Sequence, residues 1–578
     1  MNPPTEMLQW IDYVAIGGYL ATLAVLGLIM GRLIRDVGAY FKAGGTLPWQ
    51  AAAVSNFTAM LSTFMFVAYA GIAYQYGLVA VTIFWCTVPP ALAAAAVMGQ
   101  RWRRARVMTP VEYLETRFNV PVHQFLSWCG MGFRVLDNMV RLYAMAVFMS
   151  AATPLPIEVS IIVAGVVILM CTVSGGLWSV VLIDVVQFVI LILATVVMLP
   201  LVLQACGGLG SLMHTLPDHF SFFQGPKGAP LFLLAYYAMV MIKYNGNWSF
   251  IQRFYSVRDE AAGRKMAITM AVLFFVTPFF FLLPAVAAKM IVPDLANPEQ
   301  AYAVVAMRVL PHGITGLLLA AMLASTMSCV AAEFNVTASV FTQDVYRRLL
   351  RQSASSRELM WAARIATFVI GSLVIFGALF MGRFGGAFNA NMILTGLAIP
   401  LSVPLVFGIL MRRARPWGAL AAVLVGVPTG IILNLHPEVS WPVATLVVIV
   451  VSIGTMVVSG LMPIRDGAYR QRVEKFFVKL ATPVAKSEKP EIAPAFRRAL
   501  TSIFVAAFLC TGLLFVAMSL PSLGRLSGSL ALTAGGISIG LAMLIRRLGG
   551  RQTEDATASS SVVSTDVAAQ GAEQQETV

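Results

Sequence analysis

Apolar runs of about 20 residues recur from one end of the chain to the other, and each is long enough to cross a hydrocarbon core of about 30 Å as an α-helix. The charge content supports the same interpretation. Only 11% of the 578 residues are charged, less than half of the roughly 25% that a soluble globular protein carries. The sequence therefore predicts an all-α integral membrane protein that resides in a lipid bilayer, and not a soluble enzyme.

The basic residues predict how the chain is oriented in the membrane. The formal net charge is +14, and the lysines and arginines gather in short loops, such as 101–106 and 253–265, that alternate with nearly neutral loops. This alternation is typical of cytoplasmic loops in multi-span proteins, and it argues against a nucleic-acid partner. We expect a multi-pass protein of the cell (inner) membrane, with its N-terminus outside and its C-terminus in the cytoplasm.

Two apolar segments contain polar clusters that a plain membrane span does not need. The first, VSNFTAMLSTFMF, includes Ser55, Asn56 and Thr58, and the second contains Lys243 and Asn247 within five residues. Transporters often interrupt a helix where backbone groups must face a ligand near the middle of the membrane. We expect a broken helix at each of these segments.

A third segment, 315–348, combines spanning length with small and hydroxyl-bearing residues. These include Ser325, Thr326 and Ser328, followed by Cys329. A helix that faces lipid does not need such a cluster. A helix that lines an ion site does, because a desolvated cation must replace its water shell with protein oxygens.

Several motifs occur in an order and spacing that resemble the sodium:solute symporter family, the group of sodium-coupled sugar, proline and sialic-acid transporters. They are Tyr40-Phe41-x-Ala43-Gly44, Leu47-Pro48-Trp49, Thr109-Pro110-x-Glu112-Tyr113-Leu114-x-x-Arg117-Phe118, Ser174-Gly175-Gly176-Leu177-Trp178, Ile183-Asp184-Val185-Val186-Gln187, Gln252-Arg253 and the segment 315–348. The resemblance covers roughly residues 10 to 465.

The resemblance implies a LeuT-like inverted-repeat core of ten helices, with one extra N-terminal helix and about four extra C-terminal helices. It also implies alternating access to a central site. The expected parts are an extra N-terminal transmembrane helix (1–35), the transport core (48–411), two further transmembrane helices (412–463), a basic cytoplasmic loop (464–499), two C-terminal transmembrane helices (500–547) and a disordered cytoplasmic tail (548–578).

The resemblance also implies one sodium site. In the family's register, backbone carbonyls come from Thr58, Leu61 and Ser325, and hydroxyls come from Ser328 and the residue after it. That next residue is Cys329 here, where family members usually carry Ser or Thr. A neutral thiol is a poor ligand for a hard cation, so we expect weak sodium binding. A plain buried thiol is the alternative interpretation of Cys329.

Asp184 matches the family's acidic residue near the sodium site. Carboxylates inside membrane spans are costly and usually functional, so Asp184 is a candidate to balance the sodium charge. A structural role beside a backbone or hydroxyl group is the alternative. A second sodium of the kind that some members bind is not expected, because its ligand positions read Ala331 and Ala332.

The solute site is less well specified by the sequence. The positions where sugar-transporting members place polar side chains look like Met65 and Phe84, beside Trp85, which disfavours a sugar. Lys243 falls where relatives carry an aromatic gate, and a buried ammonium needs an anion. It therefore predicts an anionic or zwitterionic solute. An ion pair with Asp137 or Glu333 remains the alternative for Lys243.

Three more residues complete the sequence prediction. Asn247 belongs to the interrupted helix, and Asn389 begins the tenth core helix, where relatives line the outer vestibule and where helix capping is the alternative. Arg141 lies four residues after Asp137, a spacing that predicts an ion pair on one helix.

The leading functional hypothesis is sodium-coupled symport of a small organic solute into the cell, with sodium as a transported ion and no cofactor. The alternative is a proton-coupled or uncoupled carrier, or a transporter-like solute sensor with a degenerate sodium site, which Cys329 suggests. The sequence contains no nucleotide loop, metal cluster or paired catalytic carboxylates, so an enzyme is not expected.

Overall fold

The structure is a computed structural model that describes residues 8–34, 36–384, 387–436, 438–463, 466–490 and 494–547. It divides into two compact units, Met1–Pro490 and Glu491–Val578. The expected disordered tail, 548–578, lies outside the described residues.

Helices build the first unit. In chain order they are α1 (Trp10–Leu33), α2 (Val37–Lys42), α3 (Trp49–Phe64), α4 (Ala70–Tyr76), α5 (Val79–Phe84), α6 (Val88–Ala93), α7 (Gly99–Ala105), α8 (Tyr113–Arg117), α9 (Val120–Ala152), α10 (Ile157–Ala205), α11 (Leu209–Thr215), α12 (Pro230–Asn245), α13 (Trp248–Ser256), α14 (Glu260–Ile291), α15 (Ala301–Val309), α16 (Ile314–Val340), α17 (Ser356–Ala378), α18 (Ala387–Leu410), α19 (Pro416–Leu435), α20 (Trp441–Leu461) and α21 (Gly467–Ala481).

Among the described residues of both units, ten helices are long and apolar enough to cross a membrane, or eleven when one bent pair is counted as a single span. Other expected spans also coincide with helices that are shorter or more polar. Helix α9, for example, carries Arg134, Asp137 and Arg141. Charged side chains inside a span are tolerated when they face the protein interior, so α9 remains a predicted span.

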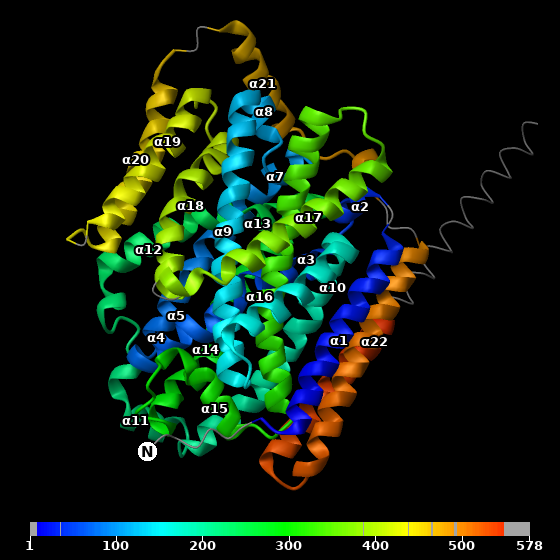
Figure 1. Cartoon of the computed structure of the whole chain (residues 1–578), viewed down its shortest axis with the longest axis vertical. Helices are drawn as coiled ribbons and strands as arrows, with labels where there is room; N and C mark the ends of the chain where they lie inside the picture. The colour runs from blue at the N-terminus through cyan, green and yellow to red at the C-terminus, as the bar shows by residue number, and fades with distance from the viewer. Residues whose placement is uncertain are drawn as a thin grey trace, which may run out of the picture. The chain divides into compact units, whose positions relative to one another are not determined.

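Helix α16 forms the centre of the first unit. All of its residues are buried, and it packs against α1, α3, α9, α10 and α17 (Figure 1). A helix that is apolar or small on every side belongs in the interior, and the sequence of α16 is rich in Ala, Ser and Leu. The segment with the hydroxyl cluster is therefore surrounded by protein on all sides.

Both expected helix breaks occur. Helices α3 and α4 are joined by a π-helical turn, Met65–Tyr69, and the segments on either side are bent by 58°. Helix α12 ends at Asn245, and α13 begins two residues after Gly246. Broken helices expose backbone carbonyls and amides that a continuous helix would satisfy internally.

A third break lies inside α10, at Gly176, where φ is 53° and ψ is −152°. Residues with a side chain rarely adopt this backbone conformation. A Cβ atom here would also lie 2.5 Å from the carbonyl oxygen of Tyr40. The glycine thus divides α10 into two helical segments.

The segment predicted as a basic cytoplasmic loop, 464–499, contains the helix α21 in its described part. Helix α21 buries Val473, Phe476, Phe477 and Leu480 and packs against α7 and α8. Their spacing places these residues on one face of a helix. Asp466 accepts hydrogen bonds from the backbone at the start of α21, as helix-capping residues do.

The second unit consists of α22 (Pro494–Ser519) and a helix at Leu526–Arg547. The Ser538 hydroxyl donates a hydrogen bond of 2.8 Å to the carbonyl of Phe508. Helix α22 begins six residues before the expected boundary at 500.

Candidate functional site

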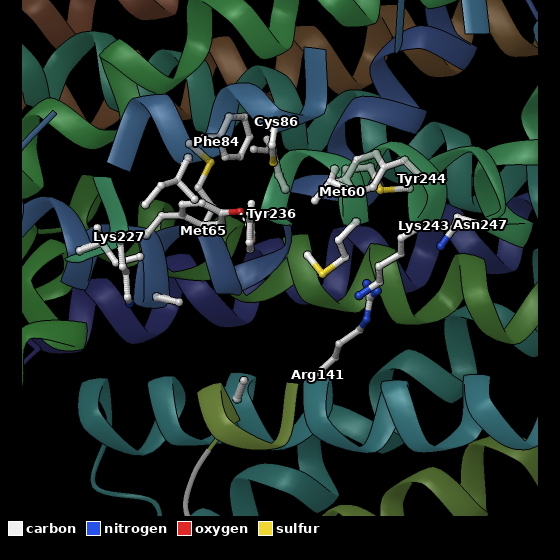
Figure 2. Close-up of a pocket in the computed structure, with 18 of the residues that line it drawn as sticks. Met60, Met65, Phe84, Cys86, Arg141, Lys227, Tyr236, Lys243, Tyr244 and Asn247 are labelled. Atoms are coloured by element: carbon white, nitrogen blue, oxygen red, sulfur yellow. Dashed lines mark hydrogen bonds between the residues drawn. The ribbon is translucent and has the colours of Figure 1, made fainter. Parts of the chain in front are cut away.

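A cavity of about 120 Å³ lies beside the broken helix α3–α4. Its walls come from α3, α4, α5, α9, α12 and α16. Four of the predicted solute-site residues line it, namely Met65, Phe84, Lys243 and Asn247 (Figure 2). The structure therefore brings together residues that are up to 182 positions apart in the sequence.

Two predicted solute-site residues are not seen at the cavity. Trp85 lies outside the cavity lining, where it stacks on Phe222 and Phe275 with ring centroids 5.8 and 5.0 Å away. Its indole nitrogen donates a hydrogen bond of 2.9 Å to the carbonyl of Phe275. Asn389 falls within α18, but its side chain lies outside the described part of the chain.

One end of the cavity is cationic. Figure 2 shows Arg141 reaching from α9 and Lys243 reaching from α12, with their charged groups directed toward one another. Arg141 donates from Nε to Asp137 Oδ2 at 2.9 Å, and its Nη2 lies 2.8 Å from the same oxygen. The ion pair expected from their four-residue spacing is confirmed.

The second carboxylate of this region is Glu333 of α16, which is almost fully buried. It lies 3.3 Å from Arg134 and accepts hydrogen bonds from Asn247 Nδ2 at 3.1 Å and Ser249 Oγ at 2.9 Å. Asn247 also caps α13, since its Oδ1 accepts from the amide of Phe250 at 2.9 Å. The break between α12 and α13 is therefore fixed to α16.

Lys243 lies among charged groups of both signs. The charged groups that act on it are Asp137, Arg141, Arg134 and Glu333. Asp137 is paired with Arg141, and Glu333 is paired with Arg134. Arg141 and Lys243 both line the cavity, and these two cationic donors suit an anionic group there.

The other part of the cavity is mainly aromatic and apolar, apart from Lys227, which Figure 2 shows at the end away from Lys243. Met65 and Phe84 lie against Tyr69, whose ring centroid is 5.4 Å from that of Phe84. The Tyr69 and Tyr236 hydroxyls are 2.8 Å apart. Lys227, in the loop before α12, also lines the cavity, and burial lowers its pKa although Glu299 partly opposes this shift.

The predicted sodium ligands lie where α3 breaks and where it packs against α16. Thr58 and Leu61 precede the break and are buried. The hydroxyls of Thr58, Ser325 and Ser328 are buried, and they have no hydrogen-bond partner within the part of the chain that the structure describes. Buried hydroxyls without partners are costly, and a cation that accepts their lone pairs removes that cost.

Cys329, the residue after Ser328, contacts the positively charged side chain of Arg141. Its side chain is buried, and its sulfur accepts from Nη1 of Arg141. Arg141 thus touches both the solute cavity and the predicted sodium site. The sequence indicated Arg141 only as the partner of Asp137; its position as a charged residue inside an apolar span was the available signal.

Asp184 has a partner that the sequence did not indicate. Its Oδ2 accepts from the Ser55 hydroxyl and lies 3.2 Å from Nη2 of Arg253. The side chains of Asp184 and Arg253 are both fully buried. The Arg253 Nε also donates to Ser55 at 2.9 Å. The carboxylate therefore joins α10 to α3 and α13, and its charge is balanced by an arginine.

A broken helix, buried hydroxyls without hydrogen-bond partners among the described residues, and a cavity lined by Arg141 and Lys243 together indicate a secondary transporter. Residues 40–426 of the chain match the family model described as "Sodium:solute symporter family". That match covers more than half of the chain, and the protein belongs to this family. It is a multi-pass membrane transporter, not an enzyme, and it couples sodium to the symport of a small solute.

Curated relatives cover most of the chain at low identity. The sodium/glucose cotransporter of Vibrio parahaemolyticus is 24% identical over 74% of this chain and 86% of its own length. The sodium/sialic acid symporter SiaT of Proteus mirabilis is 24% identical over 72% and 88%, respectively. The sodium/pantothenate symporter of Escherichia coli is 25% identical over 73% and 88%.

Among solved structures, a Na⁺-coupled sialic acid symporter in a substrate-bound, outward-open state is similar, with a TM-score of 0.69. The two chains are 21% identical, and the match covers 78% of this chain and 98% of that one. This similarity confirms the expected all-α, LeuT-like fold.

Proposed function

We propose that this symporter imports a small carboxylate, either an anion or a zwitterion, together with one sodium ion. The observation that carries the proposal is the cationic end of the cavity, where Arg141 and Lys243 meet. A guanidinium presents paired donors to a carboxylate, and an ammonium adds a second charge-assisted contact.

The composition of the cavity and two of the relatives support this solute class. Met65 and Phe84 offer no hydrogen bonds to the hydroxyl groups of a sugar. Two of the similar proteins are symporters of sialic acid and of pantothenate, and both of these solutes carry a carboxyl group. The cavity volume suits a small solute and not an oligosaccharide.

For sodium, we propose carbonyl ligands from Thr58, Leu61 and Ser325 and a hydroxyl ligand from Ser328, with Cys329 at the fifth position. The Ser328 hydroxyl supports this assignment, because it is buried and has no hydrogen-bond partner among the described residues. The other oxygen ligands in the proposed set are backbone carbonyls. Hydroxyl and carbonyl oxygens are both hard donors of the kind that a desolvated sodium ion requires. One sodium is proposed, because Ala331 and Ala332 offer no side-chain ligands at the positions of a second site.

Lys243→Met is expected to weaken binding of a carboxylate solute by at least about tenfold, since a charge-assisted hydrogen bond contributes about 1.5–3 kcal/mol. A neutral analogue of the same shape should lose much less. Binding is measured by the shift in melting temperature of the detergent-purified protein across a panel of carboxylates and their amides.

The matched control for that experiment is Lys289→Met. Lys289 lies outside the cavity lining and donates to the carbonyl of Pro293 at 3.0 Å, so this variant should bind like the wild type. Equal losses for the carboxylate and the amide in Lys243→Met would contradict the proposed role of Lys243.

We further propose a cell-membrane location with an outside N-terminus and a cytoplasmic C-terminus, because the basic loops alternate with neutral ones. In a Cys510→Ser background, a membrane-impermeant maleimide added to intact cells should label Ser221→Cys and miss Lys475→Cys. Both positions are exposed. The reverse labelling pattern would overturn the orientation.

A further inference from the structure

The guanidinium of Arg141 lies between the solute cavity and the predicted sodium site. Nε and Nη2 are directed to Asp137, whereas Nη1 is directed to the sulfur of Cys329. The same side chain lines the cavity beside Lys243 (Figure 2). One planar cation therefore faces a carboxylate on its own helix, the solute space and the fifth sodium position.

This arrangement affects sodium in two ways. Cys329 replaces an oxygen ligand with a thiol, which binds a hard cation poorly. Arg141 also places a fixed positive charge against that thiol, and like charges in a poorly solvated site repel one another. Asp137 offsets part of this charge, but Lys243 adds another cation at the same end of the cavity.

We infer that Arg141 makes sodium affinity depend on the anion in the cavity. Without an anion, the guanidinium against Cys329 opposes sodium at Ser328. When a carboxylate binds Arg141 and Lys243, it neutralises this charge and sodium binds more tightly. By thermodynamic reciprocity, sodium raises the affinity for the carboxylate by the same factor. This inference rests on the proposed carboxylate solute and the proposed sodium site.

The contacts also explain why an arginine fits this role. Asp137 holds two nitrogens of the planar guanidinium, and this fixes the direction of the third nitrogen, which points at Cys329. Arg134 is about two turns earlier on α9, and it is paired with Glu333 instead. The two arginines of α9 therefore differ in their contacts. Arg141 contacts Cys329 at the predicted sodium site, whereas Arg134 pairs with Glu333.

The first test uses sodium alone on the detergent-purified full chain. Asp137→Asn combined with Arg141→Met removes both charges of the ion pair, so that neither of the two stays buried without the other. The matched control is Arg104→Met combined with Glu260→Gln, an ion pair with its atoms 3.0 Å apart that lies outside the cavity lining. The sodium concentration for half-maximal thermal stabilisation, titrated against choline, should fall at least about tenfold in the first variant and stay within about threefold of wild type in the control.

The second test adds benzoate or acetate as the probe anion. In the wild type, a bound probe should lower the half-maximal sodium concentration, whereas in Asp137→Asn/Arg141→Met it should have no effect. An unchanged sodium midpoint in that variant without any anion overturns the inference. A probe that binds the wild type without moving the sodium midpoint also overturns it, but leaves the proposed carboxylate solute intact.

A third outcome separates the two proposals in the other direction. If the sodium midpoint falls as expected in Asp137→Asn/Arg141→Met but no carboxylate binds the wild type, the repulsion by Arg141 is supported while the proposed solute class fails. Arg141→Lys serves as a second variant, because it keeps the charge but has no planar fork to reach Asp137 and Cys329 together. Its sodium midpoint should lie between those of the wild type and the double variant.

Discussion

Replacing Arg253 with Met is expected to destabilise the folded transporter by about 3–5 kcal/mol, the cost of breaking a buried ion pair by removing one partner. Arg253 and Asp184 are both fully buried, with Nη2 and Oδ2 3.2 Å apart. Without Arg253, the Ser55 hydroxyl remains as a hydrogen-bond donor to that oxygen. The melting temperature and the monodisperse yield of the purified protein should both fall sharply.

Two variants give this prediction its controls. Asp184→Asn combined with Arg253→Met removes both charges and should be far less destabilised than the single change, since no unpaired ion stays buried. Arg308→Met, at an exposed arginine, should leave the melting temperature unchanged. Identical melting temperatures for the single and the double variant would show that the pair contributes little to stability.

The double variant also distinguishes two roles of Asp184. The sequence suggested a carboxylate that balances the sodium charge, whereas the structure pairs it with Arg253. If the role is structural, Asp184→Asn/Arg253→Met should retain sodium-dependent uptake. If the carboxylate is needed for sodium, uptake should require much higher sodium concentrations even though the protein folds.

The contrast between Asp184 and Asp137 shows what the sequence can predict. Asp137 and Arg141 are four residues apart on one helix, so helical geometry alone brings them together. Asp184 and Arg253 are 69 residues apart, on α10 and α13. The sequence marks each as a costly charge in an apolar region, but only the packing of separate helices reveals that they neutralise each other.

The cavity shows that sequence-based prediction has the same limit for single side chains. Phe84 and Trp85 are neighbours in the sequence, and both were predicted at the solute site. Successive residues on a helix are rotated by about 100°, so that the two side chains point in different directions. Phe84 lines the cavity, whereas Trp85 stacks on Phe222 and Phe275. Choosing between them requires the rotation of α5, which the motif register does not provide.

Helix breaks were predictable because they have a local cause. Polar residues within an apolar run mark the segments at Thr58 and at Asn247, and both segments are broken in the structure. Helix α21 was not predicted, because its burial depends on contacts with distant parts of the chain. Its apolar residues are few and lie among charges, and they are buried only because α7 and α8 cover them.

Cys329→Ser is expected to lower the sodium concentration for half-maximal uptake by about tenfold to a hundredfold. An oxygen contact to a desolvated cation is comparable to a hydrogen bond with a charged group, about 1.5–3 kcal/mol, and each 1.4 kcal/mol is about one decade of affinity. The new hydroxyl would add an oxygen beside Ser328, where the thiol now meets Arg141.

Ser328→Ala should have the opposite effect, because it removes a buried hydroxyl that has no protein partner among the described residues. Half-maximal uptake should then require at least about tenfold more sodium, or uptake should be lost. Cys206→Ser, at another buried cysteine whose sulfur faces the carbonyl of Ala287, should leave the sodium dependence unchanged. If Cys329→Ser and Ser328→Ala both behave like this control, sodium does not bind at this corner of α16, and the coupling ion must be sought elsewhere in the transporter.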